Sequence, residues 1–166
     1  MHARSIASLV LLSVLAAATT ALGEARAPPA PNQAGVIQRA DGKAVLVPNG
    51  AAPHPAKVGD IVSEGDVLAS GPGGEIHVTM QDSGFLVVRP ESRVRIVSYQ
   101  ADGAADDKGV LRLIAGGLRS ITGWIGKYNP RGYKVQTAGA TIGIRGTDHE
   151  TRYIPEGSAE GEPSGM

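Results

Sequence analysis

Asp148-His149-Glu150 is the stretch whose residue types could do chemistry, because a histidine between two carboxylates can bind a metal or transfer a proton. On a strand, alternate side chains point to opposite faces, so His149 points away from both carboxylates. Two further histidines, His54 and His77, stand at no ligand-like spacing to His149. We therefore expect a solvated strand face here, with neither a metal site nor a catalytic residue.

Covalent and phosphate chemistry find no support in the sequence either. The chain has no cysteine, which excludes thiol nucleophiles, thiolate zinc sites, iron–sulfur clusters and disulfides. It also has no G-x-S-x-G nucleophile elbow, and the Gly-rich turn at residues 70–74 lacks the Lys-Ser/Thr pair of a phosphate-binding loop. The sequence thus predicts no enzyme and no cofactor.

A Gly-Asp step occurs twice in residues 57–69, K-V-G-D-I-V-S-E-G-D-V-L-A, as Gly59-Asp60 and as Gly65-Asp66. Carboxylate oxygens are the ligands that Ca²⁺ prefers, but these donors lack the Asp-x-Asp-x-Asp spacing of a calcium loop. We interpret each step as a tight turn in which the Asp accepts hydrogen bonds from nearby backbone N–H groups.

The loop at residues 101–109, A-D-G-A-A-D-D-K-G, brings Asp102, Asp106 and Asp107 together. Three carboxylates could coordinate a cation. A polar, Gly-bearing segment is more typical of an exposed loop, so a solvated acidic tip without metal is expected.

The aromatic side chains concentrate in residues 124–133, W-I-G-K-Y-N-P-R-G-Y. Aromatic rings with interleaved cations are frequent at contact sites, which favours a surface for a ligand or a partner. The same rings could instead pin a loop to the core, and the two interpretations carry equal weight. The candidate binding residues are Trp124, Lys127, Tyr128, Arg131 and Tyr133.

The first residues follow the order of a secretory signal peptide. A short basic start to Arg4 precedes an apolar run from Ile6 to Ala18, and Ala21-Leu22-Gly23 offers small residues to a signal peptidase. The apolar run is shorter than the about 20 residues of a membrane span. We expect a signal peptide over 1–23, a Pro-rich tail over 24–34, a β domain over 35–154 and a flexible tail over 155–166, with no span after cleavage.

Composition and periodicity predict an all-β domain. The 23 Gly and 11 Pro residues suit a turn-dense β protein, and residues 75–80 and 93–99 alternate apolar and polar side chains. Residues 85–88, F-L-V-V, form a further strand. We expect short antiparallel strands in a sandwich- or β-roll-like fold. With 16 basic and 16 acidic residues, no nucleic-acid surface is predicted.

Turn residues predict two hairpins and one irregular strand. Asp41-Gly42 separates two short apolar runs, and Gly116-Gly117 separates another two. In residues 137–150, T-A-G-A-T-I-G-I-R-G-T-D-H-E, glycines interrupt a strand pattern, which marks a bend or the close approach of another backbone. A structural role is therefore expected for Gly143, Gly146 and Thr147.

Four motifs in this order make the chain resemble FecR-type periplasmic domains. They are the Gly-Asp echo at 57–69, the V-T-M-Q-D-S-G-F-L-V-V-R-P-E-S run at 78–92, L-R-L-I-A-G-G-L-R at 111–119 and the I-R-G-T stretch at 144–147. The resemblance covers residues 35–153. It implies a fold that binds a protein or ligand outside the cytoplasm.

In the iron-dicitrate regulators of that family, the domain senses an outer-membrane receptor and relays its state through a membrane span to a segment that controls a sigma factor. Here the signal peptide starts at residue 1, so neither a retained span nor a cytoplasmic segment is expected. The resemblance implies a non-catalytic, periplasmic or secreted interaction or sensing module with an envelope protein as partner. The alternative is a periplasmic module that binds a small ligand, a glycan or a metal.

Overall fold

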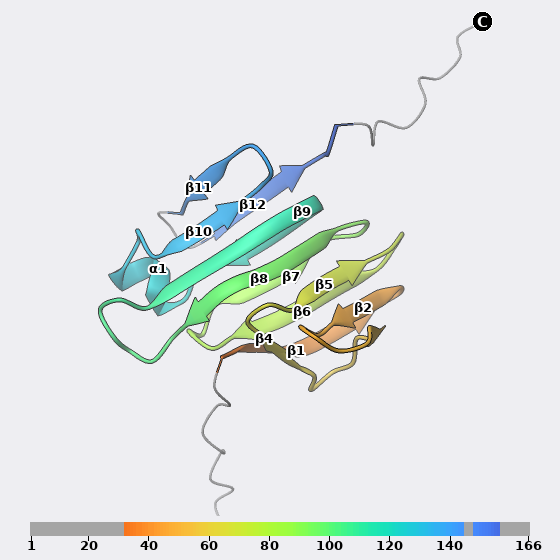
Figure 1. Cartoon of the computed structure of the whole chain (residues 1–166), viewed down its shortest axis with the longest axis horizontal. Coiled ribbons are helices and arrows are strands. Elements are labelled where there is room, and N and C mark those ends of the chain that lie inside the picture. The colour runs from red at the N-terminus through yellow and green to blue at the C-terminus, as the bar shows by residue number, and fades with distance from the viewer. Residues whose placement is uncertain (1–31, 145–147, 157–166) are drawn as a thin grey trace, which may run out of the picture.

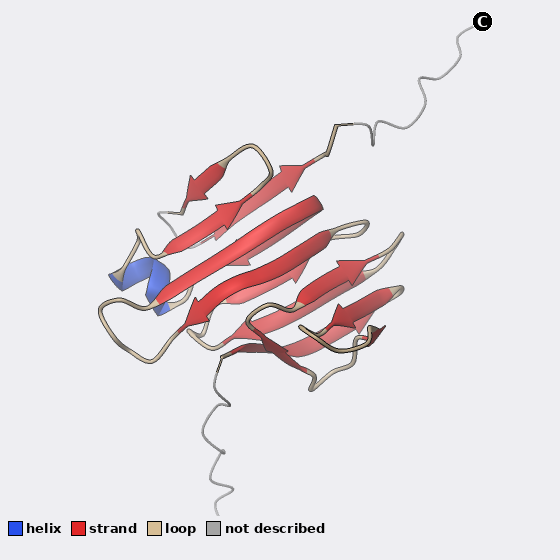
Figure 2. Ribbon diagram, viewed as in Figure 1, coloured by secondary structure: helices blue, strands red, loops and turns tan. Residues whose placement is uncertain are grey.

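The computed structural model describes residues 32–144 and 148–156, whose regular secondary structure is strand apart from one short helix (Figures 1 and 2). This confirms the predicted all-β class. The elements in chain order are β1 Gln33–Asp41, β2 Ala44–Val47, β3 His54–Pro55, β4 Ile61–Ser63, β5 Val67–Ser70, β6 Glu75–Met80, β7 Phe85–Val88, β8 Arg93–Gln100, β9 Lys108–Ile121, α1 Trp124–Tyr128, β10 Tyr133–Gln136, β11 Thr141–Gly143 and β12 Asp148–Tyr153.

The strands form one sheet that curls over, so that two layers enclose a common core (Figure 1). In the A layer, β4, β1, β6, β7, the second part of β9 and β12 are neighbours in that order. In the B layer the order is β3, β2, β5, β8, the first part of β9, β10 and β11. All of these pairs are antiparallel except β9 with β10, whose connection contains α1.

Alternation along the strands decides which side chains enter the core. On β6, Ile76, Val78 and Met80 are buried, while the residues between them are partly exposed. On β8, Val94 and Ile96 are fully buried. Burying one such side chain contributes about 1.5–3 kcal/mol, so these inward rows supply much of the energy that holds the two layers together.

The predicted hairpin at Asp41-Gly42 is wrong. β1 pairs with β4 and β6 in the A layer, whereas β2 pairs with β3 and β5 in the B layer. Gly42 does have the positive φ of a tight turn, 60°. The turn is a corner between layers, because β1 and β2 cover the same core from opposite sides.

The predicted hairpin at Gly116-Gly117 is also wrong, because β9 runs without interruption from Lys108 to Ile121. Its first part pairs with β8 as far as Ala115, and its second part pairs with β7 from Leu118 onward. Gly116, at φ 82°, lies between the two parts. The glycine therefore lets one long strand pass from the B layer to the A layer.

Candidate functional site

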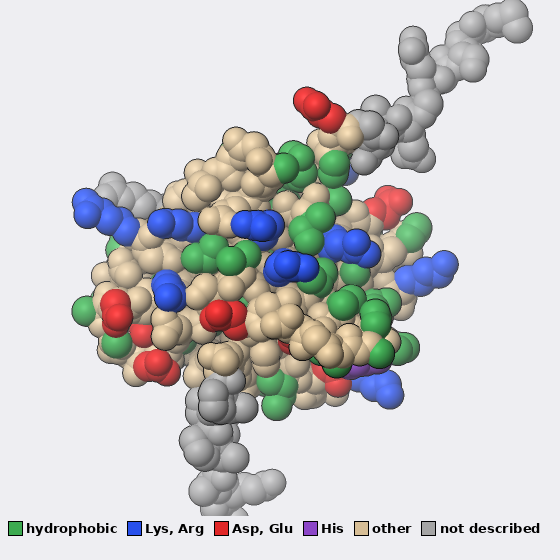
Figure 3. Space-filling model, in the orientation of Figure 1, with side chains coloured by type: hydrophobic (Ala, Val, Ile, Leu, Met, Phe, Trp, Pro, Cys, Tyr) green, Lys and Arg blue, Asp and Glu red, His purple; other side chains and the backbone are tan. Residues whose placement is uncertain are grey.

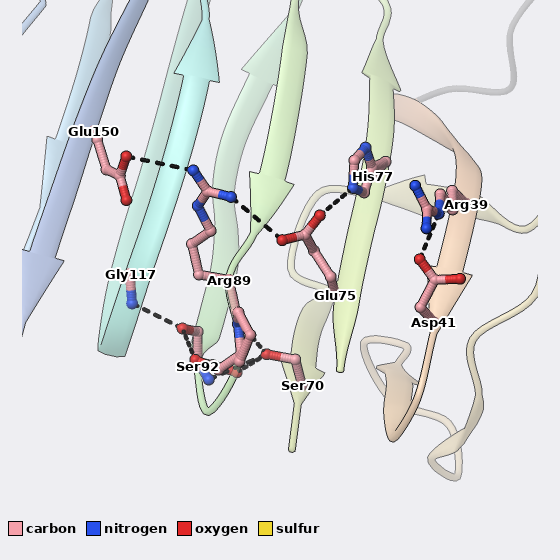
Figure 4. Close-up of polar contacts among 10 residues, drawn as sticks. Arg39, Asp41, Ser70, Glu75, His77, Arg89, Ser92, Gly117 and Glu150 are labelled. Carbon is pink, nitrogen blue, oxygen red and sulfur yellow. Dashed lines mark hydrogen bonds and ion pairs between the residues drawn. The ribbon is translucent and has the colours of Figure 1, made fainter. Parts of the chain in front are cut away.

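Two buried serines fix the turn that follows β7, residues 89–92, against neighbouring strands (Figure 4). The Ser70 hydroxyl donates to the Arg89 carbonyl, and the Ser92 backbone N–H donates to Ser70 Oγ at 3.1 Å. From β9, the Gly117 N–H donates to Ser92 Oγ at 2.7 Å. Because buried hydroxyls with several partners rigidify their surroundings, this turn forms a firm wall beside β9.

Arg89 leaves this turn and joins two carboxylates on the outward face of the A layer (Figure 4). Its Nη1 lies 3.3 Å from Glu75 Oε2 on β6, and its Nη2 lies 3.4 Å from Glu150 Oε2 on β12. Glu75 also contacts His77 Nε2. The hydrogen bond from His77, followed by the attraction of Arg89, lowers the pKa of Glu75 against the opposing effect of burial. We call Glu75, Arg89 and Glu150 the charged row. Its two ion pairs link β6 and β12 to the turn that follows β7.

A groove of about 720 Å³ opens next to this row, where β9 changes layer. Gly116 lies at the floor of the groove. A Cβ at this position would lie 2.2 Å from Ser92 Oγ and 2.5 Å from the Glu91 carbonyl oxygen, so only a glycine can be accommodated there. The groove is lined by Arg89, Pro90, Glu91, Ala115, Gly116, Gly117, Glu150, Arg152, Tyr153, Ile154 and Pro155.

The groove offers charge of both signs beside apolar surface. Within the described part of the chain, Glu91 and Arg152 form no ion pair, whereas Arg89 and Glu150 pair with each other. Ile154 is 64% exposed at the end of β12. A rigid wall with a free carboxylate, a free guanidinium and an exposed aliphatic side chain is suited to binding a polypeptide.

The five candidate residues of the aromatic segment divide into two groups. Trp124 is half-buried, and its Nε1 donates to Asp107 Oδ2 at 3.1 Å. Tyr133 is 1% exposed, and its hydroxyl lies 2.6 Å from Ser120 Oγ. The remaining three lie on the surface at and after α1: Lys127, Tyr128 and Arg131.

Both Gly-Asp steps form turns of one kind. Gly59 and Gly65 have φ values of 91° and 93°. Asp60 Oδ2 accepts a hydrogen bond from the Lys57 N–H and Asp66 Oδ2 one from the Ser63 N–H, each at 2.8 Å and each from three residues earlier. The carboxylates are thus occupied by backbone donors.

The glycine-rich stretch is only partly described. Gly143 ends β11, is exposed, and has open space where a Cβ would stand. Gly146 and Thr147 lie outside the described residues.

The acidic loop differs from the predicted solvated tip at one position. Asp102 and Asp106 are exposed, but Asp107 is 3% exposed. Its carboxylate accepts the backbone N–H groups of Asp102 and Gly103 at 3.1 and 2.9 Å, in addition to the indole of Trp124. Asp107 therefore closes its own loop and holds α1 against it.

The predicted solvated face at 148–150 is wrong for His149. Asp148 and Glu150 do point outward, and Asp148 forms a bidentate ion pair with Arg119. His149 points inward, its ring edge-on to Tyr133 at 6.3 Å between centroids. Among the described residues neither ring nitrogen has a hydrogen-bond partner, and both are buried. Burial lowers the pKa of His149, and the Asp148 carboxylate opposes this shift.

A buried polar pair ties the β6–β7 turn to β8. The Tyr99 hydroxyl donates to Asp82 Oδ1 at 2.7 Å, and the Gly84 N–H donates to the same oxygen at 2.9 Å. Asp82 is 1% exposed. Burial, and the nearby Asp82 carboxylate, raise the pKa of Tyr99 well above its usual range. This pair is enclosed by the core and is not part of the groove.

Sequence reasoning did not find the groove or the row at Glu75, Arg89 and Glu150. Alternation placed Glu75 on an outward face, but it does not say which strands are neighbours. Arg89 and Glu150 are separated by 61 positions and meet only because β7 and β12 both pair with β9. No local pattern signals that contact.

Comparison with known proteins identifies the family to which this chain belongs. The structure is a small all-β domain with a groove where β9 crosses between the layers. A family model described as "FecR protein" matches residues 66–159, more than half of the chain. The chain belongs to the FecR family, which confirms the predicted resemblance. This is a regulatory family that acts in envelope signalling.

Other comparisons add little. One solved structure, titled "Cell surface anchoring domain", is similar to this chain at 23% identity, over 39% of this chain and 84% of that one, with a TM-score of 0.37. A search of the curated proteins found no match. Over residues 32–144 and 148–156, no helix is long and apolar enough to cross a membrane, and no three His, Cys, Asp or Glu side chains are grouped to hold a metal.

Proposed function

We propose that this FecR-family chain is a non-catalytic module that binds an envelope protein at the Gly116 groove, after export to the periplasm or secretion from the cell. The observation that carries the proposal is the groove itself. Its wall is held rigid by Ser70 and Ser92, and its rim presents Glu91 and Arg152, which form no ion pair with any residue that the structure describes. Rigid concave surfaces with apolar and charged side chains are preferred positions for partner contacts.

Site-specific photo-crosslinking in the producing cell tests this proposal. A photoreactive residue at Ile154, on the groove, should yield an adduct with one defined envelope protein, identified by mass spectrometry. The charge reversal Arg152→Glu should reduce that adduct strongly, because it leaves like charges at the rim. The same probe at Val58, which is 69% exposed in the loop before β4, is the control position.

A second candidate function rests on the exposed ring of Tyr128, between the surface cations Lys127 and Arg131. An exposed aromatic ring with neighbouring cations is suited to a small ligand or a glycan. A probe at Tyr128 separates the two candidates. Adducts at Tyr128 with none at Ile154 would favour the aromatic segment and contradict the groove.

A further inference from the structure

The outward face of the B layer carries a band of cations across three neighbouring strands. Arg93 and Arg95 stand on β8, Arg112 on β9 and Lys134 on β10, each between inward-facing neighbours. The strand register places Arg95 directly opposite Arg112. Figure 3 shows basic side chains gathered across this face, with the acidic side chains mostly outside the band. We call these four residues the cationic face.

The four cations of this face differ from three arginines of the A layer. Arg39, Arg89 and Arg119 each form an ion pair on the A layer. Within the described residues no member of the cationic face does so, and Arg112 donates only to the Gln136 amide oxygen at 3.2 Å. Like charges directly opposite each other on a sheet are destabilising, so the fold itself gains nothing from this arrangement. An external anion would remove the repulsion.

We propose that the cationic face binds an acidic, extended polypeptide segment of a partner. Side chains at alternate positions of an extended chain are about 6.6–6.8 Å apart, the same repeat that separates Arg93 from Arg95. Guanidinium groups bind carboxylates through two parallel hydrogen bonds, and three of the four cations are arginines. A segment that carries Glu or Asp at alternate positions, lying along β8, matches both features.

The surroundings of the face favour a polypeptide over a lipid bilayer. Ala69 on β5 lies directly opposite Arg93, and Val45 on β2 lies directly opposite Ala69. Both side chains are only half-buried. Arginine beside modest apolar surface is typical of protein interfaces. Binding to a bilayer also requires large apolar side chains that insert into it. The large apolar side chains that are exposed in the described chain do not lie on the outward face of β2, β5 and β8. They are Val58, Ile61, Phe85, Ile121, Tyr128, Ile142 and Ile154.

Arg93 is paired with Ala115, which lines the groove, but Arg95 and Arg112 do not line it, so variants at these two arginines test the cationic face separately from the groove. The probe is a fluorescent synthetic peptide of alternating Glu and Thr, titrated with the full exported chain, and a peptide of alternating Lys and Thr is the control. We expect the Glu peptide alone to bind, and added salt to weaken it. Arg95→Gln and Arg112→Gln should each weaken binding about tenfold, because each removes charged hydrogen bonds.

Lys57→Gln is the matched control, since Lys57 is an exposed cation in a loop away from this face. It should bind the Glu peptide like the parent. Thermal melts should show Arg112→Gln at least as stable as the parent, which separates lost binding from lost folding. Absence of Glu-peptide binding, or parent-like binding by both arginine variants, would overturn the proposal. So would tighter binding of phosphatidylglycerol vesicles or of polygalacturonate, which would assign the face to a membrane or a glycan.

Discussion

A buried imidazole without a hydrogen-bond partner makes a folded protein sensitive to acid, because the unfolded chain takes up the proton more readily. Both ring nitrogens of His149 are buried without a hydrogen-bond partner among the described residues; the ring faces Tyr133, and burial lowers its pKa below the ordinary 6.5. Between pH 6.5 and the lowered value, the unfolded state therefore binds more protons than the folded one. The contribution of His149 to stability is complete above pH 6.5 and decreases as the pH falls below it.

We accordingly predict that His149→Leu, which cannot take up a proton, loses less stability than the parent when the pH is lowered from about 7 to about 5. Urea melts across this range measure the difference. Val58→Ala is the control, because Val58 is exposed in the loop before β4 and carries no titratable group, so this variant should keep the parent's pH dependence. Parallel pH profiles for the parent and His149→Leu would show that His149 is not the sensitive group.

In the region of α1, we expect the substitution of Asp107 to lower the free energy of unfolding most. Asp107→Ala leaves the N–H groups of Asp102 and Gly103 and the Trp124 indole without their acceptor. Because these hydrogen bonds are only partly buried, water can satisfy some of the donors, and we expect a total loss of about 1–3 kcal/mol. Asp106→Ala, on the exposed tip, should stay within about 0.5 kcal/mol of the parent. Chemical denaturation of both variants checks this, and equal stabilities would refute the assigned role.

Trp124→Phe isolates the indole hydrogen bond. It keeps an aromatic ring against the core but removes the donor to Asp107. The expected loss of unfolding free energy is about 1 kcal/mol, the net worth of one hydrogen bond. If Trp124 also contacts a partner, crosslinking yield will fall by more than this stability change explains.

At the scale of elements, the crossing of β9 between layers is the feature that depends most on one backbone conformation. Gly116 combines a φ of 82° with a floor too close for a Cβ. We predict that Gly116→Ala costs on the order of 1–3 kcal/mol through backbone strain, and more if Ser92 is displaced. Gly139→Ala, where no atom lies within 4 Å of the added Cβ, should leave the melting temperature nearly unchanged. A parent-like melt of Gly116→Ala would mean that β9 can cross without a glycine.

At the scale of the whole molecule, the first described strand, β1, begins at Gln33, inside the segment predicted as a Pro-rich tail, and the predicted signal peptide lies outside the described residues. We predict that the exported product begins near Glu24. N-terminal sequencing of the protein from a periplasmic fraction measures this directly. Recovery of the chain with Met1 intact in the membrane fraction would contradict the interpretation.

The amino-acid sequence by itself determined the local features of this protein. Alternation in E-I-H-V-T-M placed β6 at Glu75–Met80 and identified its inward side chains, because the two faces of a strand follow from a period of two residues. Ordered motifs indicated the FecR family, which the family model confirmed. Gly42 and Gly116 do have positive φ values, but the hairpins predicted from these turn residues are wrong.

Only the tertiary structure decided which strands and which charged side chains become neighbours. Asp41-Gly42 became a corner and Gly116 a crossing, because pairing between strands depends on how two layers cover one core and not on the turn residues between them. The charges illustrate the same limit. A balance of 16 basic and 16 acidic residues is a sum without positions. The fold pairs Arg89 and Arg119 with carboxylates on one layer, and on the outward face of the other it gathers four cations that have no ion pair among the described residues.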